Sequence, residues 1–143
     1  MLINRNENIQ GFFHTFVGMG IEIIKPSFSK AKPKATIHLS GKLGFNIQAS
    51  NLMEMKSETA FHFAKDTDDD KKFYLITGTK EDGAAKVAKA GEYYYINLGD
   101  VFDIVGLNYK EETIIFDINK DTHNGKPMYV LSKRKPILRK KKN

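Results

Sequence analysis

The sequence predicts a mainly β protein with short helices, in which two tandem β-β-α-β-β units form a pseudo-twofold barrel behind an N-terminal helix. The first observation is a repeat: residues 65–67 (Lys-Asp-Thr) recur 55 positions later as residues 120–122. Further upstream, three positions of residues 35–41 (Ala35, Ile37 and Gly41) fall on Ala85, Val87 and Gly91 with an offset of 50. The second observation is that apolar residues alternate with polar ones through most of the repeated stretches, which is typical of strands. Each unit has too little apolar surface to close a core by itself, so the two should share one.

The bulk composition predicts one soluble globular domain. The chain has 143 residues, of which 41% are hydrophobic and 28% are charged, as in ordinary globular proteins. It lacks an apolar run of about 18 residues and a basic leader followed by an apolar stretch, so we expect neither a membrane span nor a secretory signal. It also has no cysteine, which excludes disulfides and thiolate chemistry and fits a reducing compartment. We therefore expect a cytoplasmic protein.

The positive charge is concentrated at the two ends. The formal net charge is +6, and residues 133–143 hold seven Lys and Arg with no acid. The remaining residues carry 16 Lys and Arg against 17 Asp and Glu, although residues 1–34 alone carry five cations against two acids. The repeated body is therefore mildly acidic, and any basic surface comes mainly from the ends.

Residues 6–24 are predicted to form an amphipathic helix. Asparagines stand at its start, where they can cap a helix, and apolar residues then recur at spacings of three and four. Phe12, Phe13 and Phe16 lie on that stripe, and burying each contributes roughly 1.5–3 kcal/mol. The helix would either cover an end of the barrel or make an oligomer contact. The rest of the segment 1–34 is an extended basic linker.

The first unit is assigned to residues 35–78 and the second to residues 85–132, with a Gly-rich connector at 79–84 and a basic tail at 133–143. In the first unit, the expected strands are 35–40, 43–47, 59–65 and 72–77, with one or two helical turns near 52–55. In the second unit, they are 85–90, 92–97, 113–119 and 128–133, with a helix at 100–105.

The second unit resembles the AbrB/SpoVT swapped-hairpin family. In that family a strand, a Gly turn and a second strand lead into a short helix closed by a Leu-Gly-Ile-like sequence. The matching residues are Val87, Gly91, Tyr95-Ile96-Asn97, Val101-Phe102-Asp103-Ile104-Val105-Gly106-Leu107 and Thr113-Ile114-Ile115-Phe116. The resemblance implies an interleaved barrel made by two units, here within one chain as a pseudo-dimer, and a DNA-binding regulator. Gly106 can adopt the left-handed conformation that ends a helix, so that Leu107 packs back on it.

No pattern in the sequence predicts catalysis or a metal site. Residues 66–70 are an acidic run, but Lys71 stands where a calcium loop needs glycine and Thr77 where it needs a bidentate glutamate. This run is therefore predicted to be a solvated turn. The four histidines are scattered singly, and neither a nucleophile elbow nor a phosphate-binding loop is present. We expect no cofactor, no metal and no enzymatic activity.

The run Tyr93-Tyr94-Tyr95 is the aromatic candidate for binding. In a strand, Tyr94 points away from the side that carries Tyr93 and Tyr95. One side then belongs to the core, and the rings of the other side either pack across strands or stack on unpaired bases.

The basic ends are the second candidate. Their cations can replace condensed counterions on phosphates, a contact that reads no base sequence; a disordered, solubilising tail is the other interpretation. The residues concerned are Lys30, Lys32, Lys34, Lys133, Arg134, Lys135, Arg139, Lys140, Lys141 and Lys142.

Two functions follow from these features. The first is an AbrB-like DNA-binding protein that contacts double- or single-stranded DNA through its basic ends. The second is a non-enzymatic interaction or assembly module that uses the aromatic N-terminal segment, with a second copy of the chain as partner. Neither involves a membrane.

Overall fold

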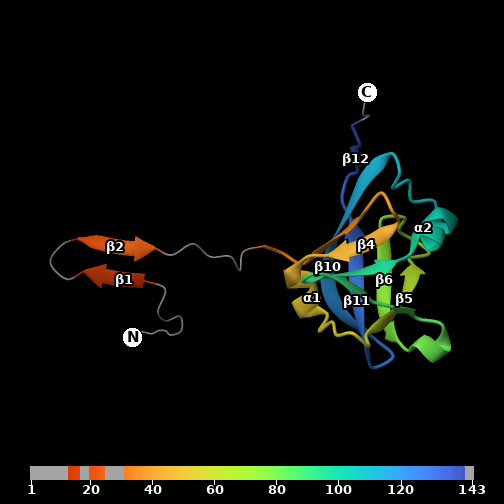
Figure 1. Ribbon diagram of the computed structural model, residues 1–143, viewed down its shortest axis with the longest axis horizontal. Helices are drawn as coiled ribbons and strands as arrows, with labels where there is room; N and C mark the ends of the chain where they lie inside the picture. Colours follow the sequence, from red (N-terminus) through yellow and green to blue (C-terminus); the bar gives the residue numbers. More distant parts are fainter. Residues whose placement is uncertain (1–12, 17–19, 25–30, 141–143) are drawn as a thin grey trace. The chain divides into compact units, whose positions relative to one another are not determined.

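The computed structural model describes residues 13–16, 20–24 and 31–140, which divide between a first unit, Met1–Lys30, and a second, Ala31–Asn143. The first unit contains strands β1 (Phe13–Phe16) and β2 (Ile21–Ile24). They pair in antiparallel register from Phe13↔Ile24 to Phe16↔Ile21 (Figure 1).

The helix predicted for residues 6–24 is wrong where the structure describes that segment, since β1 and β2 stand in its place. Its apolar residues are mostly aromatic or β-branched, which favours strands over helix. Gly20 has φ +64° in the turn between the strands, a conformation that suits a hairpin turn. Phe13 and Phe16 therefore lie on β1, and Phe12 lies outside the described residues.

The second unit is a nearly closed, barrel-shaped sheet with few short helices (Figure 1). Among the described residues, no helix is long and apolar enough to cross a membrane. The elements, in chain order, are β3 (Lys34–Ile37), β4 (Lys42–Phe45), α1 (Ile47–Leu52), β5 (Ala60–Lys65), β6 (Lys72–Gly78), the 3₁₀ helix η2 (Lys80–Asp82), β7 (Ala85–Lys86), β8 (Ala88–Ala90), β9 (Tyr93–Asn97), α2 (Gly99–Val105), β10 (Glu112–His123), β11 (Lys126–Lys133) and β12 (Ile137–Leu138).

The barrel closes through residues 85–90. The strand order is β7-β5-β6-β11-β10-β3-β4-β9-β8, with β12 added at the start of β10, and every neighbouring pair is antiparallel. β7 and β8 are separated by Val87 alone, whose N–H donates to the carbonyl of Thr59 (2.9 Å). One short stretch of chain thus pairs with β5 through its first residues and with β9 through its last.

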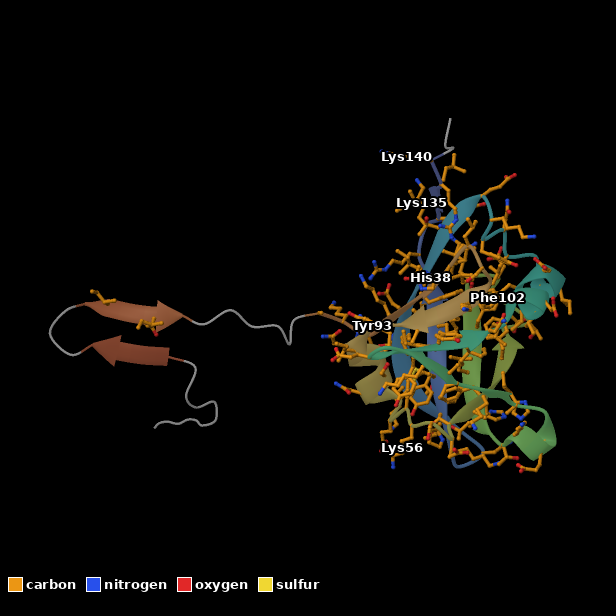
Figure 2. The ribbon with its side chains drawn as sticks, in the orientation of Figure 1. His38, Lys56, Tyr93, Phe102, Lys135 and Lys140 are labelled. Carbon is orange, nitrogen blue, oxygen red and sulfur yellow. The ribbon has the colours of Figure 1, made fainter. Side chains whose placement is uncertain are left out.

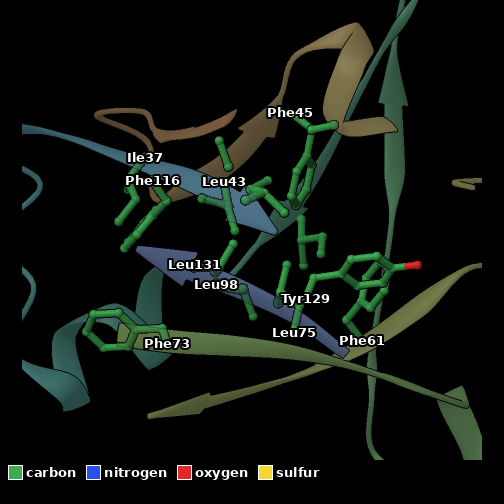
Figure 3. Packing of buried hydrophobic residues seen from close by; sticks show 14 of the residues in the cluster. Ile37, Leu43, Phe45, Phe61, Phe73, Leu75, Leu98, Phe116, Tyr129 and Leu131 are labelled. Atoms are coloured by element: carbon green, nitrogen blue, oxygen red, sulfur yellow. The ribbon is translucent and has the colours of Figure 1, made fainter. Parts of the chain in front are cut away.

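The interior of the barrel is apolar. Side chains that alternate inward from the strands fill it, with Phe61, Phe116 and Leu131 fully buried (Figure 3). In residues 31–140, no side chain of the polar or charged types is buried. A functional surface built from polar groups must therefore lie on the outside of the barrel.

Both helices are fixed by local capping. The side chain of Asn46 accepts a hydrogen bond from the Ala49 N–H (2.8 Å), so α1 begins directly after β4, earlier than the turns predicted near residues 52–55. Gly106 ends α2 at φ +79°, and the Leu107 N–H donates to the Phe102 carbonyl (2.9 Å). Leu107 is buried against the core, as predicted for this end of the helix.

After the β5–β6 connection, equivalent positions of the two units are displaced by one residue. Tyr129 is buried, whereas Tyr74 lies on the outer side and its neighbour Phe73 is buried instead. The offset of 55 residues predicts that Tyr74 and Tyr129 occupy equivalent places, and this prediction is wrong. Residues 66–71 separate β5 from β6, whereas β10 and β11 are joined by the tight turn Asn124-Gly125. A shift of one residue in a strand moves every side chain to the other face.

The basic tail is tied to the barrel as far as residue 139. β12 pairs with β10 at Leu138↔Glu112 and Ile137↔Thr113, and the backbone N–H of Arg139 donates to the Glu111 carbonyl (2.8 Å). The guanidinium group of Arg139 donates to two backbone carbonyls, those of Tyr109 (2.8 Å) and Ile37 (3.1 Å). This side chain holds three segments together.

We predict that Arg139→Gln lowers the free energy of unfolding by about 1.5–3 kcal/mol, the usual contribution of hydrogen bonds to a charged group. Lys140→Gln removes the same charge one residue later from an exposed position and should leave stability unchanged. Urea denaturation of both variants checks this. Equal stability of the two variants would show that the guanidinium group does not hold the tail.

Candidate nucleic-acid interface

An aromatic hollow of about 450 Å³ opens on the outer surface of the barrel, over β3, β4, β8 and β9. It brings together residues from positions 36 to 95, and none of them is acidic. Its lining residues are Thr36, His38, Lys42, Gly44, Phe45, Asn46, Ala90, Tyr93, Tyr94 and Tyr95.

Strand alternation positions the three tyrosines. Ile96 is buried and Tyr94 packs against the core, so Tyr93 and Tyr95 project from the opposite side of β9. This is the arrangement that the sequence predicts. β9 pairs with β4 at Gly44↔Tyr95, which places the tyrosine-bearing strand beside the residues of the first half of the barrel.

The tyrosine rings differ in what already covers them. The Lys42 ammonium group lies 4.7 Å from the ring centroid of Tyr95, and that of Lys89 lies 5.3 Å from the centroid of Tyr94. Both are cation–π contacts. Tyr93 is 56% exposed, and no aromatic or cationic side chain of the described residues stacks on it. Its ring is the one open to a ligand.

His38 lies against Gly44 in the lining of the hollow, where Gly44 leaves room for the imidazole because it has no side chain. A Cβ atom at Gly44 would stand 2.5 Å from Nε2 of His38, closer than any real contact allows. The histidine is on the outer side of β3, as the alternation of that strand predicts. Its imidazole nitrogens add a donor and an acceptor to an otherwise mainly apolar hollow.

A basic cluster lies on the other side of β3, where β3, β10 and the end of β11 meet. Two shallow hollows there, of about 390 and 340 Å³, share Arg134. The smaller is lined mainly by cations, and the larger contains Lys32, Arg134 and the one carboxylate among the lining residues, that of Asp117. We define the basic cluster as Lys32, Lys34, Lys71, Lys133, Arg134 and Lys135, and include Lys34 because its charge acts on Asp117.

Asp117 lies among three of these cations, Arg134, Lys32 and Lys34. Arg134 donates to both of its oxygens, from Nε (3.0 Å) and from an Nη nitrogen (2.7 Å). This bidentate pair, and then the charges of Lys32 and Lys34, lower the pKa of Asp117 below its usual value. Arg134 is thus partly neutralised, and the lysines carry the positive charge that remains available.

The predicted cations fall into three groups, and Figure 2 labels Lys135 of the first and Lys140 of the second. Lys32 and Lys34 from one end of the sequence meet Arg134 from the other at Asp117, because β3 pairs with β10 and β11 follows β10. Lys133 and Lys135 line the second hollow with Arg134. Arg139 is occupied by backbone carbonyls, and Lys140 lies beyond β12. Lys30, Lys141 and Lys142 lie outside the described residues.

Three functional candidates were not predicted from the sequence: His38, Lys42 and Lys71. Lys42 and His38 alternate onto the outer side of their strands, which was a usable signal, but their neighbourhood depends on the pairing of β4 with β9. Lys71 follows the acidic run, and its approach to the cluster depends on the backbone contact between Lys133 N–H and the Lys71 carbonyl (2.8 Å).

The acidic run forms a closed turn. The carboxylate of Asp66 accepts hydrogen bonds from the backbone N–H groups of Asp68 (2.8 Å) and Asp69 (2.9 Å) and from the hydroxyl of Tyr74. The Tyr74 hydroxyl and then these N–H groups hold the pKa of Asp66 below its usual value. In the part of the chain that the structure describes, no group of three or more His, Cys, Asp or Glu is arranged to hold a metal ion.

Comparisons of the chain with protein-family models, with curated proteins and with solved structures found no match.

Proposed function

We propose that this chain is a DNA-binding protein, which contacts phosphates through the basic cluster and presents the aromatic hollow on the same outer surface. The observation that carries the proposal is the basic cluster itself. The cluster draws its cations from three separate parts of the sequence. Arg134, Lys32 and Lys34 lie around the carboxylate of Asp117. Lys71, Lys133 and Lys135 line a second hollow, which shares Arg134 with the first. Such a surface gains affinity by releasing the counterions condensed on a nucleic acid.

Position on the sheet supports a joint use of the cluster and the hollow. Lys34 and Thr36 both project outward from β3, Lys34 toward the cluster and Thr36 into the hollow. In the sheet, β9, β4, β3, β10 and β11 are consecutive neighbours. The tyrosines of the hollow and the cations at the end of β11 are therefore separated by on the order of 20 Å along the curved surface. A nucleic-acid strand of a few nucleotides spans that distance.

We further propose that the barrel is a duplicated AbrB-like unit. Supporting this, Phe116 of β10 pairs with Ala35 of β3, and Phe61 of β5 pairs with Ala85 of β7. Phe61 and Phe116 are equivalent positions of the repeat, and so are Ala35 and Ala85. In both pairs a strand of one half contacts a strand of the other half, as an interleaved pseudo-dimer requires. The first arginine after Arg5 is Arg134, so the DNA contacts of this chain would come from lysines rather than from the arginines that the family uses.

A second candidate function, self-assembly, is favoured by the hairpin β1–β2. Its strands have four residues each, and a two-stranded hairpin of this size is at best marginally stable in water. Ile21 and Ile23 on β2 are also about half exposed. We propose that this hairpin is stabilised by pairing with the hairpin of a second copy of the chain.

For DNA binding, we predict that Lys133→Gln with Lys135→Gln weakens binding to all sequences alike. The slope of log affinity against log salt should become shallower by about one to two units, because each lost phosphate contact removes about 0.9 on duplex DNA. The matched control is Lys56→Gln with Lys80→Gln, which removes the same charge from two exposed sites outside the cluster. If both double variants change the slope equally, net charge rather than the cluster determines binding.

For self-assembly, we predict that the full chain sediments as a dimer and that a chain without residues 1–24 sediments as a monomer. The barrel is a compact unit of its own, so we predict that its thermal unfolding is little changed. Sedimentation velocity at several concentrations measures both states. A full chain that is monomeric throughout, or a shortened chain that remains dimeric, would contradict the hairpin's role.

A further inference from the structure

We propose that the aromatic hollow captures an unpaired base of single-stranded DNA, with Tyr93 as the stacking platform and His38 facing the edge of the base. The inference rests on the proposed DNA binding and adds the strand form and the residue that recognises it. The hollow suits a polyanion because Lys42 is among its lining residues and no acidic residue is.

The choice of Tyr93 follows from what covers the other two rings. Tyr95 already has the Lys42 ammonium group 4.7 Å from its centroid, and Tyr94 packs against the core with Lys89 over its ring. Tyr93 is the most exposed of the three. A base that stacked on Tyr93 would displace no aromatic or cation–π contact of the described side chains.

An unpaired base is required because stacking needs a free face. In a duplex, both faces of each base are covered by its neighbours, whereas a single strand can turn a base outward onto an aromatic side chain. The contact is tolerant of sequence, because every base has such a face. The hollow therefore predicts a preference for strand form rather than for a particular sequence.

His38 contributes a polar group to the lining of the hollow. Its imidazole lies against Gly44, and the two ring nitrogens can donate to and accept from a base edge. Gly44→Ala would push the imidazole out of this place without changing any charge. The barrel has a matched site on other strands: a Cβ at Gly78 would stand 2.6 Å from the ring of His62, and neither residue lines the hollow.

The phosphates on one side of the captured base would extend over β3 toward the basic cluster. Lys34 lies on this path, since it is exposed on β3 and paired with Asp117 of β10. The hollow and the cluster thus have separate roles. The cluster binds any nucleic acid, and the hollow adds affinity only for a strand with unpaired bases.

The test compares a 12-nucleotide oligo-dT with a 12-base-pair duplex, both fluorescently labelled, in anisotropy titrations of the full chain at about 50 mM salt. We expect the wild type to prefer the single strand. Tyr93→Ala should lower affinity for oligo-dT by about 5- to 150-fold, the usual range for losing one stacked base, and change duplex affinity less than twofold. Tyr93→Phe, which retains the ring, should restore most of the lost affinity.

The chain has six tyrosines and no tryptophan, so quenching of tyrosine fluorescence by oligo-dT gives an independent measure of stacking.

Gly44→Ala should also weaken oligo-dT binding and not duplex binding, whereas Gly78→Ala should change neither. If Tyr93→Ala binds oligo-dT as tightly as the wild type, base capture is wrong. The proposed DNA binding would still be supported if the wild type binds both DNA forms. If the full chain binds neither form, both the inference and the proposed function are wrong.

Discussion

The structure depends on the pairing of residues 85–90 with two different strands. β7 joins β5 and β8 joins β9, and Val87 between them keeps its own hydrogen bond to Thr59. Without this stretch the sheet would have two open edges, and the apolar side chains of its inner face would meet water. Closing the sheet removes most of the exposed edge and allows an interior without a buried polar side chain among residues 31–140.

The same closure decides where function can lie. Because alternate side chains of each strand fill the interior, the chemically versatile residues of the barrel are those that point outward. β3 is the strand on which they meet, since its neighbours are β10 on one side and β4 on the other. The basic cluster and the aromatic hollow are therefore consequences of strand order. The sheet brings together cations that are about a hundred residues apart in the chain, such as Lys34 and Arg134 beside Asp117.

Local patterns predicted local structure well. The Asn124-Gly125 turn has both residues at positive φ, 52° and 77°, as its sequence indicates, and Gly106 ends α2 with Leu107 packed back as expected. The outward projection of Tyr93 and Tyr95 also follows from simple alternation. The prediction of a helix failed in the aromatic N-terminal segment, where the spacing of apolar residues and the residue types favour different structures. The apolar residues recur at helical spacing, yet the strands β1 and β2 form there.

What the sequence could not predict depends on distant pairing. The slip of one residue between β6 and β11 follows from unequal turns, and it decides that Tyr129 rather than Tyr74 is buried. Arg139 belongs to a charged run that is typical of a free tail, and only the folded chain brings the carbonyls of Ile37 and Tyr109 to it. Lys71 joins the cluster through the backbone of Lys133, a contact that no local pattern encodes.

The central claim is that DNA lies across the outer surface of β3, between the hollow and the basic cluster. The most direct measurement is a map of backbone amide chemical shifts in the full chain, recorded during titration with oligo-dT. The account predicts that the largest changes fall on β3, β4 and β9 and at the end of β11, with η2 and the turn at residues 66–71 little affected apart from Lys71. Changes concentrated on η2, α1 or the Asn124-Gly125 turn would place DNA elsewhere and contradict the account.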